Sequence, residues 1–156
     1  TAITQILRGG VDLQVVLNGA LAGLVSITAG PDTPSIGMAI LIGGVGAALM
    51  VATARLLLLL KVDDVIGAVP VHLTCGIWGT LAVAITDPGA VFQVQLAGVA
   101  AISVFTILTT TVTWLLLKVV MRLRLSQGEE AIGIDRIETG VLAYPEFVTR
   151  TYSSGP

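Results

Sequence analysis

Four uncharged and mostly apolar stretches divide this chain. They are residues 13–31, 33–54, 65–86 and 88–117, with lengths of 19, 22, 22 and 30 residues. A transmembrane helix needs roughly 20 predominantly apolar residues, so each stretch is about long enough to cross a bilayer. The pattern predicts four transmembrane helices within residues 15–124, at about 15–30, 36–60, 64–86 and 91–122.

These stretches are better suited to helices than to strands. A membrane strand alternates apolar and polar side chains, whereas the residues from Leu56 to Leu60 are apolar on every side. The connections are short, and two of them, Gly30–Pro34 and Thr86–Gly89, have the composition of turns. Consecutive helices must therefore run antiparallel. We predict an all-α, polytopic membrane helical bundle.

Residues 1–14 and 125–156 lie outside the predicted bundle. The first segment contains Arg8, Gly9 and Asp12 and lacks the basic and then apolar order of a signal peptide. We expect it to be a cytoplasmic loop that belongs to a longer chain. The second segment is rich in Asp, Glu and turn-forming residues, which predicts a water-soluble tail.

The basic residues predict the orientation of the helices. Arg8 precedes the first helix, Arg55 and Lys61 lie near the second connection, and the other five lie at or beyond the end of the fourth helix. The first and third connections contain no Lys or Arg. Because cytoplasmic loops carry an excess of these residues, both ends of the chain are predicted on the cytoplasmic side of the cell (inner) membrane.

Composition excludes several classes of protein. Hydrophobic residues make up 54% of the chain and charged residues 12%, against about 25% charged in soluble domains. The net charge of −2 does not indicate a nucleic-acid partner. One His and one Cys cannot form a metal site alone, and the sequence has no phosphate-binding loop or activated nucleophile. We therefore predict no metal, no cofactor and no enzymatic activity.

His72 is the only histidine, and it lies within the third predicted helix. An ionisable side chain in a membrane helix is costly, so it usually faces a cavity or a partner. Ala68 and Cys75, one turn away on either side, are small and leave space beside the ring. Removal from water favours the neutral imidazole, which both donates and accepts a hydrogen bond. His72, Ala68 and Cys75 are therefore candidate pore residues; a structural hydrogen bond to a neighbouring helix is the alternative for His72.

Three more residues near this helix have structural interpretations. Pro70 removes a backbone donor and leaves the carbonyl of Ile66 without its helical partner, which predicts a kink. The kink either serves packing alone or directs His72 into a lumen. Asp63 and Asp64 are expected to cap the helix at the membrane edge, since free amides and the helix dipole favour negative charge there. Permeant binding by this pair is the alternative.

Small residues predict how the helices pack. They allow helix backbones to approach closely in lipid. In the first two predicted helices they include Gly19, Gly23, Ser26, Gly37, Gly43, Gly44 and Gly46. The fourth predicted helix carries Ser103, Thr106, Thr110 and Thr113 along one face. We predict that these hydroxyl groups form hydrogen bonds to neighbouring helices; the alternative is that they form a polar wall of the pore.

Three segments resemble the ammonium transporter family (Amt/Mep/Rh). Leu17–Val25 is similar to the family's NGxLAGLV segment, and Asp63–Thr80 is similar to its DD…VHGxCGxWG stretch. Gly133–Asp135 and Ala143–Pro145 are similar to its GLD…AYP tail. The segments follow one another in the family's order and at fitting distances, and together they cover nearly the whole chain.

The resemblance implies the last four of eleven spans and a homotrimer in which each subunit has its own hydrophobic pore. It also implies conduction of ammonium or ammonia past a pair of histidines. His72 would be the second of the pair, and the first would lie upstream of this chain. Gly133, Asp135 and Tyr144 match a tail that docks PII-type regulatory proteins in bacterial members.

The sequence departs from the family pattern at several positions. Leu73 follows the histidine where glycine is usual, Val65 stands where proline is common, and residues 138–140 replace a typical EHG. A bulky Leu73 is expected to change packing beside the pore. These departures leave two alternatives to a transporter open, an ammonium-sensing membrane domain and a non-transporting fragment.

Overall fold

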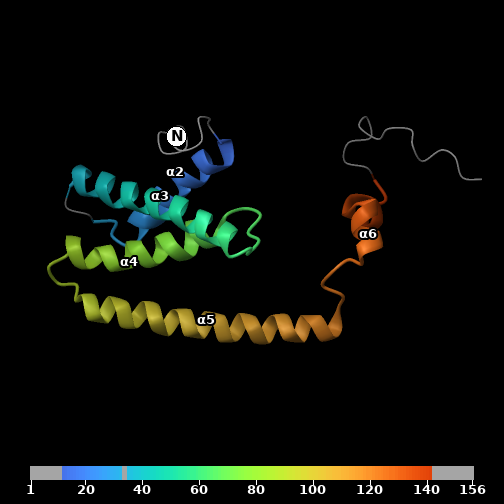
Figure 1. Ribbon diagram of the computed structural model, residues 1–156. Coiled ribbons are helices and arrows are strands. Elements are labelled where there is room, and N and C mark those ends of the chain that lie inside the picture. Colours follow the sequence, from blue (N-terminus) through green and yellow to red (C-terminus); the bar gives the residue numbers. More distant parts are fainter. Residues whose placement is uncertain (1–11, 33–34, 142–156) are drawn as a thin grey trace, which may run out of the picture. The chain divides into compact units, whose positions relative to one another are not determined.

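The computed structural model describes residues 12–32 and 35–141, and every regular element within them is a helix. In chain order these are α2 (Leu13–Thr28), α3 (Ile36–Leu59), η1 (Val69–Thr74), α4 (Cys75–Thr86), α5 (Phe92–Val120), α6 (Gln127–Ile132) and η2 (Asp135–Thr139) (Figure 1). Elements η1 and η2 are π-helices, whose hydrogen bonds span five residues instead of four. The predicted all-α class is confirmed.

Three helical segments in the described part of the chain are long and apolar enough to cross a membrane. They are α3, the continuous segment of η1 and α4, and α5. Helix α2 is apolar but has 16 residues, equivalent to about 24 Å of helix, against a hydrocarbon core of about 30 Å. The division into four spans therefore stays a prediction.

The third helix begins later than predicted. The sequence pattern placed it at 64–86, whereas residues 65–67 form a turn and regular helix begins at Val69. Gly67 has a φ of +77°, a left-handed conformation that glycine adopts without steric cost. Pro70 consequently lies in the first turn of the helix, where its missing N–H is not needed. The predicted kink within the helix at Pro70 is wrong for this reason.

Helices α2, α3 and α4 pack together with η1 (Figure 1). Their shared core consists of Ala22, Met50, Val71 and Cys75, each at most 2% exposed. Part of each of these helices is therefore buried in the bundle, although their exposed surfaces are also largely apolar.

Small residues allow the helices to meet at Ser26 of α2. A methyl group at Gly46 of α3 would lie 1.8 Å from the Ser26 hydroxyl oxygen, and one at Gly79 of α4 would lie 2.4 Å from the Ser26 carbonyl oxygen. Neither position can accept a side chain unless the helices separate or shift. The Ser26 hydroxyl donates a hydrogen bond of 2.7 Å to the carbonyl of Ala22 within α2. Close packing through small residues, as predicted for Gly46, is thus part of the fold.

Helix α5 differs from α2, α3, η1 and α4 because none of its 29 residues is buried. The chain divides into two units after Phe105, which lies within α5. The first unit contains the bundle and the beginning of α5, and the second contains the remainder of α5 with α6 and η2.

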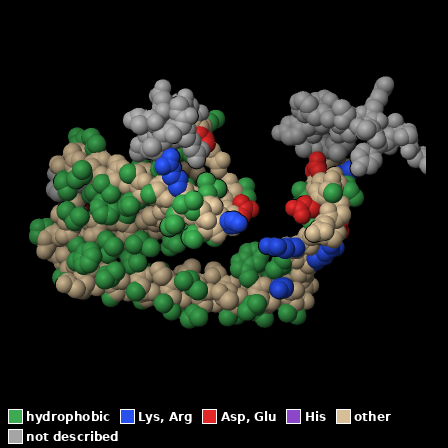
Figure 2. Space-filling view, viewed as in Figure 1, with side chains coloured by type: hydrophobic (Ala, Val, Ile, Leu, Met, Phe, Trp, Pro, Cys, Tyr) green, Lys and Arg blue, Asp and Glu red, His purple; other side chains and the backbone are tan. Residues whose placement is uncertain are grey.

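Hydrophobic side chains cover much of the visible surface of the helices, and the charged ones gather near helix ends (Figure 2). Ile36, Leu59 and Val119 are each more than 80% exposed. Soluble monomers rarely expose apolar patches of such extent. These surfaces are suited to lipid or to other membrane helices.

Candidate functional site

His72 lies in η1, and its imidazole is exposed on the described part of the chain. It borders a cavity of about 320 Å³ between η1, α4 and the beginning of α5. Its side chain is joined there by the polar side chains of Thr80, Gln95 and Ser103, and the other lining residues are apolar or glycine. Apolar walls with a few polar groups are typical of small-ligand sites. The described residues do not enclose the ring on their own.

The neighbours of His72 in η1 determine which way that residue faces. Pro70 and Val71 are buried against the bundle, so the next residue along the π-helix turns outward. Single π-helical turns within membrane helices are frequent at functional sites. No feature of the sequence pattern indicated this π-helix.

Ala68 and Cys75, the other predicted pore residues, do not line this cavity. Cys75 is fully buried in the core, and its thiol lies 3.2 Å from the carbonyl oxygens of both Gly46 and Pro70. Ala68 is half-buried at the beginning of η1. Within the described residues, the cavity therefore brings His72 together with residues from α4 and α5 instead.

Asp63 and Asp64 belong to the connection between α3 and η1. This connection lies at the other end of the bundle from the α4–α5 connection (Figure 1). The Asp64 carboxylate accepts hydrogen bonds from the backbone N–H groups of Ala68 (2.9 Å) and Val69 (2.8 Å). Two of the free amides at the helix start are satisfied in this way. Asp63 is exposed and borders a second cavity of about 350 Å³.

Two side-chain amides of α2 hold the turn that precedes η1. Gln14 Nε2 donates to the carbonyl of Val65 (2.9 Å), and Asn18 Nδ2 donates to the carbonyl of Ile66 (3.0 Å). Sequence reasoning missed both residues. The available signal was a pair of amides four residues apart, on one face of an otherwise apolar helix.

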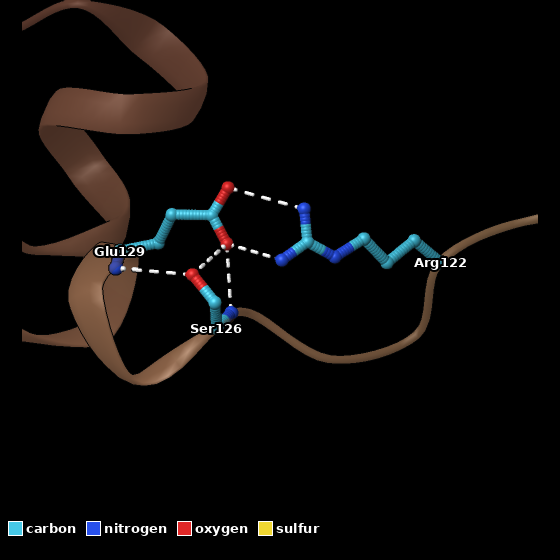
Figure 3. Close-up of polar contacts among 3 residues, drawn as sticks. All are labelled: Arg122, Ser126 and Glu129. Carbon is cyan, nitrogen blue, oxygen red and sulfur yellow. Dashed lines mark hydrogen bonds and ion pairs between the residues drawn. The ribbon is translucent and has the colours of Figure 1, made fainter.

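The connection after α5 contains a compact polar cluster (Figure 3). The Glu129 carboxylate accepts two hydrogen bonds from the Arg122 guanidinium and further ones from the backbone N–H and hydroxyl of Ser126. Ser126 in turn caps the first turn of α6, which makes a reciprocal capping box. These interactions hold the Glu129 side chain over the beginning of α6.

The predicted docking residues of the tail lie further along. Gly133 ends α6 with a φ of +101°, which only glycine adopts readily, and Asp135 begins η2. Tyr144 lies outside the described residues, as do residues 1–11 of the loop predicted at 1–14, whose last two residues belong to α2. Among residues 12–32 and 35–141, no group of His, Cys, Asp and Glu side chains could hold a metal ion.

Comparison with known proteins identifies the family. Residues 1–144 match the model of the Ammonium Transporter Family. The chain belongs to this family. Together with three helices capable of spanning a bilayer, this membership makes the chain part of a membrane protein of the ammonium transporter family.

Relatives within the ammonium transporter family match most of the chain. It is 40% identical to a Synechocystis sp. protein named as an ammonium transporter, over 83% of this chain and 30% of the relative. It is 34% and 37% identical to the ammonium transporters Amt1 and Amt2 of Haloferax mediterranei, over 96% and 89% of this chain and 29% and 33% of the relatives. The chain thus spans about a third of the length of these curated relatives. No solved structure matches it significantly.

Proposed function

We propose that the protein containing this chain conducts ammonium or ammonia across the membrane and that His72 lines the conduction path. The observation that carries this proposal is an imidazole presented beside a mostly apolar cavity on a membrane helix of an ammonium transporter family member. The relatives named as ammonium transporters support transport as the function of the protein.

The chemistry of the permeant explains why an imidazole is useful there. Ammonium is a small, strongly hydrated cation, so moving it bare through an apolar passage is very costly. Ammonia is neutral and can pass if the proton travels separately. A neutral imidazole both accepts and donates a hydrogen bond, which suits a relay with a second histidine outside this chain. His72 supplies one member of that pair.

The same proposal extends to topology and partners. The distribution of Lys and Arg favours a cytoplasmic C-terminus in the cell (inner) membrane. Large apolar surfaces on the described helices suit contacts with further spans, with lipid and with the other subunits of a homotrimer. Gly133, Asp135 and Tyr144 belong to the segment that we assign to docking of a PII-type regulatory protein.

Replacement of His72 by Ala tests the proposed role. In the complete open reading frame that contains this chain, reconstituted in liposomes, we expect ammonium-dependent current to fall at least about tenfold, the effect of losing about 1.4 kcal/mol of stabilisation along the path. Ile85→Ala is the matched control, because Ile85 is also exposed, on α4, and does not line the cavity. Normal electrogenic uptake by His72→Ala would exclude the relay. Ammonium binding without any transport by the unmodified protein would favour a sensor.

A further inference from the structure

The turn before η1 contains two backbone carbonyls, those of Val65 and Ile66, that lie outside the helix and receive no N–H from the residue four positions later. Pro70 has no N–H to offer the carbonyl of Ile66, four residues earlier. The N–H of Val69, which would serve the carbonyl of Val65, instead donates to the Asp64 carboxylate. A carbonyl without a partner at a membrane helix end is costly. The carbonyls of Val65 and Ile66 therefore need hydrogen-bond donors from another part of the chain.

Helix α2 supplies both donors. The amides of Gln14 and Asn18 lie four residues apart, on one face of α2, and donate to Val65 and Ile66 at 2.9 and 3.0 Å. Asn18 makes this contact with a short side chain, which leaves few rotamers available and fixes the distance between α2 and the turn. Gln14 is longer and more exposed and constrains the turn less.

The turn itself is fitted to the Asn18 amide. Gly67 has a φ of +77°, and a methyl group there would lie 2.4 Å from Asn18 Nδ2. The backbone thus approaches the amide more closely than any side chain at position 67 would permit. Asn18 and Gly67 form one contact between α2 and the start of η1.

This contact lies close to His72 along the chain. Ile66 and His72 are six residues apart, and the intervening residues include the buried Pro70 and Val71. Because so few residues separate the turn from His72, we expect a shift of the turn to change the rotation and height of η1. In the same segment, the Asp64 carboxylate accepts from the backbone N–H groups of Ala68 and Val69. The Asn18 amide donates to the carbonyl of Ile66 just before them.

We infer that Asn18 is a positioning residue for His72: its amide sets the rotation of η1 and so directs the imidazole toward the cavity. The inference rests on the proposed conduction role of His72 for its effect on transport. Its structural half, that Asn18 holds the start of η1, stands independently of transport.

The test compares Asn18→Asp with two controls in the complete reading frame. Aspartate keeps the shape of the side chain, but its ionised form cannot donate to the Ile66 carbonyl. We expect faster backbone hydrogen exchange across residues 66–74, a loss of ammonium current of about tenfold or more, and a changed ratio of methylammonium to ammonium transport. Asn18→Gln, which retains a donor, should recover part of the current.

The controls separate positioning from general loss of stability. Trp78→Phe removes another hydrogen bond from a side chain to a backbone carbonyl, Trp78 Nε1 to Ile42 at 3.0 Å, on the helix that continues η1. It should lower the unfolding temperature without changing the transport ratio. Gln14→Ala should change the ratio of methylammonium to ammonium transport less than Asn18→Asp does.

The outcomes distinguish the two claims. Unchanged hydrogen exchange across residues 66–74 in Asn18→Asp, or an unchanged transport ratio in a protein whose His72→Ala variant is inactive, would overturn the inference. If exchange rises but His72→Ala transports normally, the proposed function fails and the structural role of Asn18 stands.

Discussion

The three-helix bundle and α5 are both made of uncharged, apolar sequence, yet only the bundle buries its residues. Met50 and Val71 are at most 2% exposed in the bundle, whereas none of the 29 residues of α5 is buried. Lipid is as apolar as these side chains, so apolarity alone does not drive one membrane helix against another. The difference teaches that apolar length suits a helix to a membrane, whereas packing requires small residues placed where a second helix approaches.

The glycines of the two regions illustrate this difference. Gly46 and Gly79 lie where an added methyl group would meet Ser26 at 1.8 and 2.4 Å. Gly98 of α5 has no atom within 4 Å of the same added group. Gly46 and Gly79 are therefore part of a contact between helices, and Gly98 is not.

The largest effect that we expect comes from Gly79→Ala. The new methyl group would meet the backbone oxygen of Ser26, which cannot rotate away, so α2 and α4 must separate at a cost of about 1–3 kcal/mol. Gly98→Ala is the matched control and should leave stability unchanged or slightly higher, because alanine favours helix more than glycine does. Thermal unfolding in detergent measures both.

The difference in unfolding temperature between these two variants tests the comparison of the bundle with α5. Equal unfolding temperatures for Gly79→Ala and Gly98→Ala would mean that close approach at Ser26 contributes nothing to the bundle.

A smaller effect is expected from the two tryptophans. Trp78 donates a hydrogen bond of 3.0 Å to the carbonyl of Ile42 and links α4 to α3, whereas Trp114 of α5 is 59% exposed. Trp78→Phe should destabilise the protein by about 1 kcal/mol, the usual net contribution of one hydrogen bond. Trp114→Phe should have no measurable effect on unfolding. A larger loss for Trp114→Phe would show that α5 has a packing partner in the assembled protein.

The smallest effect concerns pH and the polar cluster after α5. The Ser126 backbone N–H, the Ser126 hydroxyl and the Arg122 guanidinium lower the pKa of Glu129 from its usual value of 4.5. A carboxyl group whose pKa is lowered by folding stabilises the folded state at pH values above its usual pKa. This stabilisation is lost as the pH falls through the lowered pKa. The start of α6 should therefore loosen in acid, whereas the bundle, which is held by packing, should not.

Hydrogen exchange of residues 127–132, corrected for its intrinsic pH dependence, measures this loosening between about pH 6 and about pH 3. Glu129→Gln is the control, because its side chain does not titrate and its exchange should not change with pH in this way. Identical pH profiles for the two proteins would show that Glu129 does not hold α6.

Much of the fold could be predicted from the sequence because charge is so unevenly distributed along it. The helices predicted from the uncharged stretches at 36–60 and 91–122 agree with α3 and α5 to within two residues at each end. The start of the third helix could not be predicted in the same way. It depends on Gly67 and on Asp64, whose carboxylate reaches forward to Ala68 and Val69, and neither contact has a signature in hydropathy.

The candidate site was predicted only in part. His72 was identifiable as the only histidine, in the middle of an apolar stretch, but half of the residues that line its cavity come from α5, and spacing along one helix cannot indicate those. Cys75 was predicted beside His72 from helical spacing. The π-helical turn changes that spacing, and Cys75 is buried in the core. A hydrogen-bond pattern of this kind is a tertiary outcome and not a local preference.

Ser26 has a consequence for how this chain can vary. Both α3 and α4 approach this serine, but they meet different parts of it: position 46 faces the Ser26 side chain, and position 79 faces the Ser26 backbone. A larger residue at position 46 can therefore be offset by a smaller one at position 26. No substitution at position 26 removes the backbone that position 79 meets, so in natural lineages and design libraries we expect position 79 to tolerate less variation than position 46.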